Sequence, residues 1–232
     1  MTNYTQWKSL VDLHEYSAIP DSGNLYSHYD VSDLDGLSEE DVISTLEDLS
    51  GNGRDLTGQA TYREDDLNGL PTAELDGIDD GWDSELGGVN QPQSAYAVVN
   101  VDDMSNRQTV IGAEESIGGD IVNPIEARAE DDDWQMFWGS SIQGSSVSDG
   151  WQLTSAIADG SESRFRKDGS EEFTGDVGTS EWGAGSIGYR ASENDRHLQG
   201  NIAEVLIYDV KHDDETAGEV ESYLSDKWSL TI

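Results

Sequence analysis

The stretch that decides the fold lies near the C-terminus, where residues 200–230 read GNIAEVLIYDVKHDDETAGEVESYLSDKWSL. Its apolar run from Ile202 to Tyr208 is rich in β-branched residues and too short for an independent helix, which predicts a buried strand. Acidic residues at 213–215 then stand where the dipole of a following helix favours negative charge. An apolar stripe on that helix is predicted by side chains that recur every three or four residues: Ala217, Val220, Leu224 and Trp228. A strand followed by a helix that packs on its own sheet closes a fold, so we interpret this stretch as core rather than active site.

The same stretch resembles the C-terminal strand and helix of the laminin-G-like, or concanavalin A-like, jelly-roll family. Upstream blocks are similar to patterns of that family in the same order: YDVSDL from Tyr29, DLSGNGRDL from Asp48, LNGLP from Leu67 and LDGIDD from Leu75. The resemblance covers roughly residues 25 to 230. It implies a two-sheet β-sandwich that usually serves binding or adhesion and is a glycoside hydrolase or lyase only in some branches.

Local patterns agree with an all-β chain. Buried strands are predicted at 95–101, 108–112, 151–158, 163–167 and 186–190, and 25 glycines favour short strands joined by turns. In the segment 134–138, alternation places Trp134, Met136 and Trp138 on one face and Phe137 on the other. We therefore expect an antiparallel two-sheet jelly-roll sandwich with a short C-terminal helix.

We expect one sandwich domain over residues 25–232, because no repeat or linker marks a second core in a chain of 232 residues. Residues 1–24 lie outside the family pattern and form an N-terminal extension. The extension either packs on the sandwich or docks on a larger assembly. Both interpretations stay open at this stage.

The charge is the most unusual feature of the composition. The chain has 49 Asp and Glu against 12 Lys and Arg, a net charge of −37, and the acids are spread over every segment. Seven Trp and nine Tyr argue for a folded chain rather than an acidic disordered one. We interpret the surface as adapted to molar salt, of a haloarchaeal or haloarchaeal-virus type, where screening removes self-repulsion. Nucleic acid is excluded as a partner, because reading phosphates needs clustered Lys and Arg.

The absence of cysteine excludes disulfides, thiolate metal sites and a cysteine nucleophile together. The first residues do not resemble a signal peptide, and no apolar run is long enough to span a bilayer. We therefore expect no membrane insertion. The predicted route is synthesis in the cytoplasm followed by arrival on a virion or an extracellular surface.

No catalytic residues are predicted. The two-carboxylate motif E-x-D-x-x-E of glucanases with this fold is missing, and the four histidines are dispersed. Glu126 and Glu130 fall in a stretch that looks irregular. With so many acids, pairs at glycosidase separations are expected by chance. The sequence therefore favours a protein that is not an enzyme.

A calcium ion is the cofactor that the acidic loops suggest, because hard cations need several oxygen ligands. The first candidates are Asp76, Asp79 and Asp80, and the second set is the run 131–133. Laminin-G-like domains often bind calcium at a loop rim, so the resemblance implies the same here. The alternative is a solvated acidic surface without a bound ion.

Sugar binding needs an exposed aromatic ring beside polar side chains. Trp82, Trp182 and Tyr189 lie in Gly-rich, polar contexts and are the predicted ligand-binding residues. The alternative is that these rings cap the ends of the sandwich. Trp134, Trp138 and Trp228 are assigned to the core.

Together these observations predict a non-enzymatic binding or adhesion module. The preferred setting is a spike, fibre or capsid-decorating protein of a halophilic virus that recognises a cell-surface glycan or glycoprotein and contacts other virion proteins. We expect a homo-oligomer. The alternatives are a purely structural assembly subunit and, less favoured, a glycoside hydrolase.

Overall fold

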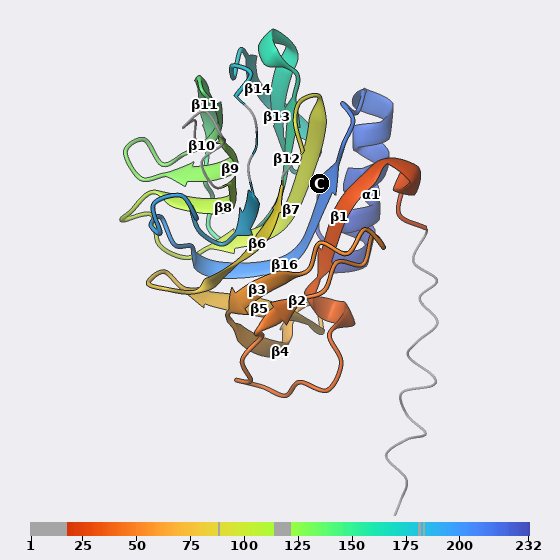
Figure 1. Cartoon of the computed structure of the whole chain (residues 1–232), viewed down its shortest axis with the longest axis vertical. Coiled ribbons are helices and arrows are strands. Elements are labelled where there is room, and N and C mark those ends of the chain that lie inside the picture. The colour runs from red at the N-terminus through yellow and green to blue at the C-terminus, as the bar shows by residue number, and fades with distance from the viewer. Residues whose placement is uncertain (1–17, 88, 114–121, 181, 183) are drawn as a thin grey trace, which may run out of the picture.

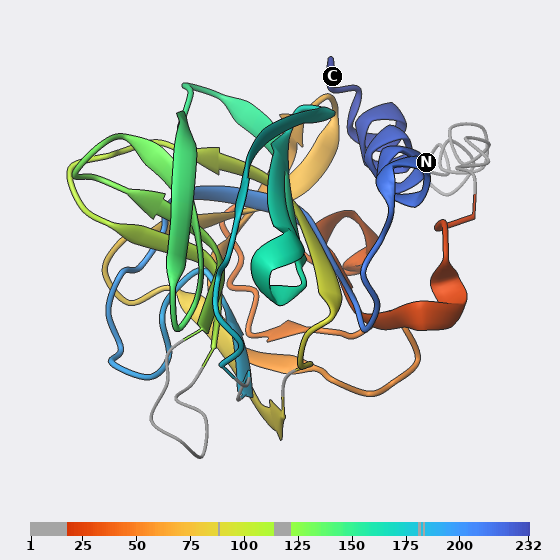
Figure 2. The ribbon, with the colours of Figure 1, turned by 90° about the horizontal axis from the view of Figure 1, so that it is seen from above.

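The computed structural model describes residues 18–87, 89–113, 122–180, 182 and 184–232. In this part of the chain sixteen strands form two antiparallel sheets of eight strands each, which pack face to face (Figures 1 and 2). One α-helix, α1 (Asp214–Trp228), covers the outside of one sheet. Three short 3-10 helices complete the described elements: η3 (Ser22–Asn24), η4 (Val31–Asp33) and η5 (Gly160–Glu162).

The sheet under the helix, sheet A, has the strand order β14-β13-β12-β7-β16-β5-β4, and β1 also pairs with β16. Its strands are β1 (Leu25–Asp30), β4 (Thr61–Leu67), β5 (Leu70–Asp76), β7 (Gln93–Val101), β12 (Trp151–Ala158), β13 (Ser163–Lys167), β14 (Ser170–Gly175) and β16 (Gln199–Tyr208).

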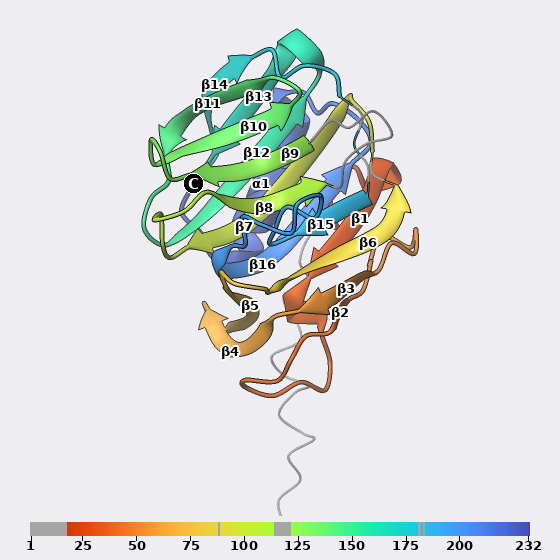
Figure 3. The same cartoon turned by 60° about the vertical axis from the view of Figure 1, so that its left-hand side comes forward.

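The second sheet, sheet B, has the order β11-β10-β9-β8-β15-β6-β3-β2. Its strands are β2 (Thr45–Leu46), β3 (Leu56–Gln59), β6 (Gly81–Gly87), β8 (Gln108–Ala113), β9 (Val122–Arg128), β10 (Asp133–Trp138), β11 (Ser141–Ser146) and β15 (Ala184–Ile187). In the described part of the chain no helix covers the outer face of sheet B, and only loops cross it (Figure 3).

The predicted closing unit is present. Strand β16 lies between β7 and β5. Asp213 caps the start of α1, and its side chain accepts a hydrogen bond from the Thr216 N–H at 2.9 Å. The predicted apolar stripe of the helix is fully buried against sheet A, where it packs on Tyr96 and Tyr208. The expectation that this stretch is core is confirmed.

The all-β sandwich with one short C-terminal helix is confirmed, and so are the bounds of β12 and β13. Trp134, Trp138 and Trp228 are fully buried. Phe137 is only partly buried and lies on the other face of β10, as the alternation predicted. The strand expected at 186–190 is shifted, because β15 ends at Ile187 and the chain turns at Gly188 with a φ of 85°.

Residues 1–17 of the predicted extension lie outside the described residues, so the two interpretations of that segment stay predictions. The described end lies beside sheet A, where the Tyr208 hydroxyl donates to the Pro20 carbonyl at 3.0 Å. Among the described residues, no helix is both long and apolar enough to cross a membrane.

Candidate functional site

Two strands of sheet B carry polar side chains on the outer face of the sandwich. In β9 the apolar side chains of Val122, Ile125 and Ala127 join the core, and Glu126 and Asn123 point to the other face. Strand β10 does the same with Gln135 and Phe137. Strict alternation would put Asn123 and Glu126 on opposite faces, but a register shift between β9 and β10 lies between these two residues, and their side chains meet in a hydrogen bond. These side chains build a polar floor opposite the core.

The segment 188–198, between β15 and β16, crosses the outer face at β8, next to this floor (Figure 3). It is fixed to β8, since the Thr109 N–H donates to the Arg196 carbonyl at 2.9 Å and the Gly188 N–H to the Val110 carbonyl at 2.9 Å. Within the segment, the buried Arg190 guanidinium forms a bidentate contact with Asp195: Nε donates to Oδ1 at 2.6 Å and Nη2 donates to Oδ2 at 2.5 Å. The segment thus brings two arginines, Arg190 and Arg196, over the polar floor.

Floor and segment enclose a hollow of about 210 Å³, here called the arginine pocket. Its lining consists of Arg107, Asn123, Arg128, Gln135, Phe137, Ser141, Arg190 and Arg196. Four of the eight arginines of the chain therefore meet in one place, although acids outnumber bases by 49 to 12.

A buried carboxylate lies under the arginines. Glu126 has no exposed side-chain surface, and its Oε2 accepts from Arg196 Nη1 at 2.5 Å and from Asn123 Nδ2 at 2.8 Å. Arg107 Nε is 3.4 Å from the other carboxylate oxygen. Burial raises the pKa of Glu126, although Arg196 and Arg107 act in the opposite direction.

The remaining partners of the arginines stand at the rim. Arg107 Nη2 is 3.1 Å from Glu130, whose side chain is 55% exposed, and Arg128 Nη2 is 3.4 Å from Asp131. Arg190 also contacts the exposed Glu193 at 2.7 Å. Apart from Glu126, the acids that balance these arginines are therefore in contact with solvent.

A second hollow of about 520 Å³, the side hollow, adjoins the arginine pocket. It is lined by Gly77, Asn106, Arg107, Glu130, Asp195, Arg196 and His197. Arg107 and Arg196 belong to both linings and stand between the two hollows. The combined volume of the two hollows falls in the range of about 300 to 1,000 Å³ that is typical of small-molecule sites.

The predicted stacking role of two tryptophans is wrong. Trp82 is fully buried in β6, where its indole N–H donates to the Ile43 carbonyl at 3.0 Å. Trp182 is only 5% exposed and belongs to the core. Nearby glycines serve close packing: Gly58 has no Cβ to clash with the Trp82 backbone in the next strand, and Gly185 lies beside the Trp182 ring.

Tyr189 differs from the two tryptophans. Its ring is partly exposed and stacks on His197, with ring centroids 5.1 Å apart, and its hydroxyl donates to Asp83. His197 lines the side hollow, so the predicted ligand-binding residue Tyr189 supports a wall of that hollow from behind. Its role in binding stays a prediction.

The three carboxylates predicted to bind calcium do meet, in the turn between β5 and β6. Oxygen atoms of Asp76, Asp79 and Asp80 lie within 4.8 Å of one another. Burial and the neighbouring charge of Asp76 raise the pKa of Asp80. Gly77 of the same turn lines the side hollow, so the turn forms part of the rim. The calcium ion itself stays a prediction.

Sequence reasoning missed the arginine pocket. Glu126, assigned to an irregular stretch, lies in β9. Strict alternation from Val122 would place Glu126 on the core side, and its outward position follows from a register shift in β9 that the sequence pattern does not reveal. The available signal was the preference for arginine: eight of twelve bases in a very acidic chain. Their meeting depends on how the segment 188–198 folds over sheet B, which spacing along the chain does not reveal.

No protein-family model matches the chain, and no curated protein matches it. Solved structures do share its fold. A Trypanosoma rangeli sialidase in complex with the inhibitor DANA superposes with a TM-score of 0.65 at 12% identity, over 93% of this chain and 35% of that one. The chain thus spans about a third of the sialidase.

Two smaller neighbours are similar in the same way. Domain 4 of AbnA, a GH43 extracellular arabinanase from Geobacillus stearothermophilus in complex with arabinotriose, gives a TM-score of 0.61 at 16% identity, over 85% of this chain and 98% of that one. An arabinofuranosidase complexed with arabinofuranosyl-alpha-1,2-xylobiose gives 0.59 at 14% identity, over 79% and 50%. These likenesses establish a jelly-roll β-sandwich fold.

The comparisons correct the expected function. The sequence predicted a non-enzymatic adhesion or assembly protein on a virion, whereas these neighbours are glycoside-hydrolysing enzymes or domains of them. The preference against an enzyme rested on a missing glucanase motif, and that motif belongs to only one of the hydrolase types built on such sandwiches. The resemblance to jelly-roll domains is confirmed at the level of the fold alone.

Proposed function

We propose that the chain takes part in glycan hydrolysis by binding a glycan in the arginine pocket. The observation that carries this proposal is the gathering of four arginines, two amides and the Phe137 ring in one hollow on the outer face of sheet B. Guanidinium and amide groups offer hydrogen bonds to sugar oxygens, and an aromatic ring accepts the apolar face of a sugar.

The comparisons support the proposal without placing the ligand. The arabinanase neighbour is a domain of nearly the same extent as this chain and is in complex with arabinotriose. The sialidase neighbours include a complex with sialic acid, although this chain corresponds to only 35% of that protein. In both cases a sandwich of this fold belongs to a protein that acts on glycosides.

Hydrolysis by this chain itself is a second candidate, favoured by one observation. Glu126 is a buried carboxyl with a raised pKa, as a general acid needs, and Arg107 links it to a second carboxylate, Glu130. Glu126 has no exposed side-chain surface, so a substrate would reach it only after Arg196 moves aside.

The test measures binding and hydrolysis on the same protein. Purified protein is applied in molar KCl to an array of oligosaccharides, and release of reducing ends is followed with the polysaccharides that bind. Saturable binding that Arg128→Gln weakens supports the proposed function. Loss of reducing-end release in Glu126→Gln, with binding retained, supports the second candidate. A folded protein that binds no glycan contradicts both.

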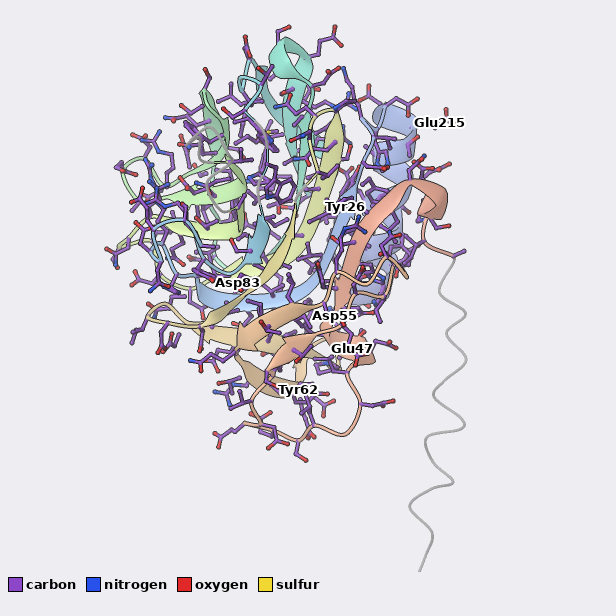
Figure 4. All side chains as sticks on the ribbon, in the orientation of Figure 1. Tyr26, Glu47, Asp55, Tyr62, Asp83 and Glu215 are labelled. Atoms are coloured by element: carbon purple, nitrogen blue, oxygen red, sulfur yellow. The ribbon has the colours of Figure 1, made fainter. Side chains whose placement is uncertain are left out.

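Three sequence predictions extend this proposal. A surface glycan or glycoprotein outside the cell stays the proposed binding partner, and a homo-oligomer the proposed state. The acidic surface supports a halophilic source. Glu47 and Asp55 lie close together beside β2 and β3, and Asp83 and Glu215 come from other parts of the molecule (Figure 4).

A further inference from the structure

The lining of the arginine pocket is dominated by hydrogen-bond donors. A guanidinium carries five N–H donors and no acceptor, and four of the eight lining residues are arginines. Among the described contacts, Arg196 uses only its Nη1, toward Glu126, and Arg190 uses Nε and Nη2, toward Asp195 and Glu193. Donor groups on both side chains are therefore left for a ligand that accepts hydrogen bonds.

Two further features of the lining point to a sugar rather than to a simple anion. Asn123 lines the pocket and is 99% buried, and its Oδ1 has no hydrogen-bond partner among the described residues. A buried acceptor without a donor is costly, and a sugar hydroxyl would supply that donor. The partly exposed Phe137 ring gives the pocket an apolar wall that a small inorganic ion would not use.

The side hollow has a different chemistry. It combines Arg107 and Arg196 with the carboxylates of Glu130 and Asp195 and the exposed amide of Asn106. The lining of the side hollow contains both hydrogen-bond donors and acceptors. This mixture suits a neutral sugar unit, because each sugar hydroxyl can both donate and accept a hydrogen bond. The two arginines shared by both hollows place such a unit next to one held in the arginine pocket.

We infer that the ligand is an acidic oligosaccharide of at least two units, whose carboxylate or sulfate group lies among the arginines and whose neighbouring neutral unit occupies the side hollow. This inference rests on the proposed function and names its ligand class. Guanidinium groups match the planar oxygen pair of a carboxylate and the oxygens of a sulfate in bidentate geometry.

The net charge of −37 does not prevent an anionic ligand from binding in molar salt, the condition to which such an acidic surface is suited. At an ionic strength of about 1 M the screening length is about 3 Å, so distant acids no longer repel an approaching anion. Contacts inside the pocket are screened less, because Arg190 and Arg128 have side chains only 5% and 16% exposed. In molar salt the arginines of the pocket therefore still attract an anionic ligand, while the acids on the remaining surface no longer repel it.

The experiment compares ligands that differ only in the acidic group. Isothermal titration in molar KCl uses a trisaccharide of one terminal galacturonate and two galactose units against its methyl ester, and a galactan trisaccharide with one terminal sulfate against its desulfated form. We expect at least ten-fold tighter binding of one acidic member than of its neutral counterpart. The pair that shows the difference distinguishes carboxylate from sulfate.

Three variants locate the site. Arg128→Gln should abolish the preference for the acidic ligand, and Arg128→Lys should keep part of it. Arg63→Gln serves as control, because Arg63 lies in β4 of the other sheet and pairs with Glu39 and Glu74. Asn106→Ala should weaken binding of the acidic trisaccharide several-fold and leave binding of the corresponding acidic monosaccharide, galacturonate or galactose sulfate, unaffected.

The outcomes separate this inference from the proposed function. Equal binding of acidic and neutral ligands that is lost in Arg128→Gln overturns the acidic class and keeps glycan binding in the pocket. Acidic preference that survives in Arg128→Gln overturns the placement of the ligand. A folded protein that binds neither member of either pair, nor any glycan on the array, overturns the proposed function itself.

Discussion

Removal of one buried carboxylate tests how the C-terminal helix is held on the sandwich. Glu204 of β16 is fully buried beneath α1. Its Oε1 accepts from His28 Nε2 at 2.8 Å and from the Tyr223 hydroxyl at 3.2 Å. Its Oε2 accepts from Lys227 Nζ and Trp228 Nε1, both at 2.7 Å. One carboxylate thus joins three residues of the helix to two strands.

The Glu204→Gln variant keeps the shape of the side chain and removes its charge. One carboxylate oxygen becomes an amide NH2 group that faces existing donors, and Lys227 keeps its contact with Asp30. Breaking a buried ion pair typically costs about 3 to 5 kcal/mol. Because Asp30 still faces the ammonium, we expect the lower end, a loss of about 3 kcal/mol in the free energy of unfolding.

The assay is urea unfolding at constant molar KCl, followed by tryptophan fluorescence. A loss of about 3 kcal/mol lowers the folded-to-unfolded ratio by about two powers of ten. Glu219→Gln is the matched control, because Glu219 is exposed on the same helix, and a change within about 0.5 kcal/mol is expected there. A loss below about 1 kcal/mol in Glu204→Gln, with an unchanged denaturant slope, would refute this account of the helix attachment.

Four other predictions follow from the structure. Calcium should raise the thermal midpoint at fixed ionic strength, and Asp80→Asn should remove the effect; a melt that neither calcium nor a chelator changes contradicts the site. Raising KCl from about 0.1 M to about 1 M should increase stability in urea, since the screening length falls from about 10 Å to about 3 Å; a decrease would contradict the halophilic interpretation. Burial alone raises the pKa of Asp48, but hydrogen bonds from Ser50 and the N–H groups of Arg54 and His28 outweigh it, so the folded pKa is lowered. Its stabilising effect is then present above the unfolded pKa of about 3.9 and is lost as pH falls through the folded pKa. Asp48→Asn should therefore be less stable at neutral pH and show a smaller drop in stability on acidification, measured by urea unfolding from pH 7 to pH 2. Trp82→Ala should cost about 3 to 5 kcal/mol, as truncation of a fully buried tryptophan does, so glycan binding should be lost only where the variant unfolds.

The core elements could be predicted from sequence because their pattern is set by burial alone. The closing strand and helix keep strict apolar spacing, and Trp134, Met136 and Trp138 alternate with Gln135 and Phe137. Strands such as β4, with sequence TYREDDL, and β11, with sequence SIQGSS, escaped prediction. Both lie at sheet edges and are largely exposed, so polar residues, acidic in β4 and uncharged in β11, replace the alternation of apolar side chains that identifies a strand.

The candidate site could be predicted only where its parts are local. Asp76, Asp79 and Asp80 lie in one turn, and their proximity follows from the chain itself. The arginine pocket joins side chains from before β8, from β9 to β11, and from the segment 188–198. The tryptophan assignment failed for a related reason: a Gly-rich context around Trp82 was taken to mean a loop, although glycine also permits close packing of strands against a ring.

The placement of the few basic residues is the strongest argument for the arginine pocket. Three of them fasten α1 to sheet A: Lys227 contacts Glu204, Arg166 contacts Glu221 at 2.7 Å, and Arg164 contacts Asp214 at 2.5 Å. The chain has about four acidic residues for each basic residue. A basic side chain in such a chain points to a position where a positive charge is needed to pair with an anion. The four arginines of the pocket pair with Glu126, which is buried, and otherwise with acids that are in contact with solvent. The anionic group of the proposed glycan would take the place of these exposed acids as a partner of the arginines.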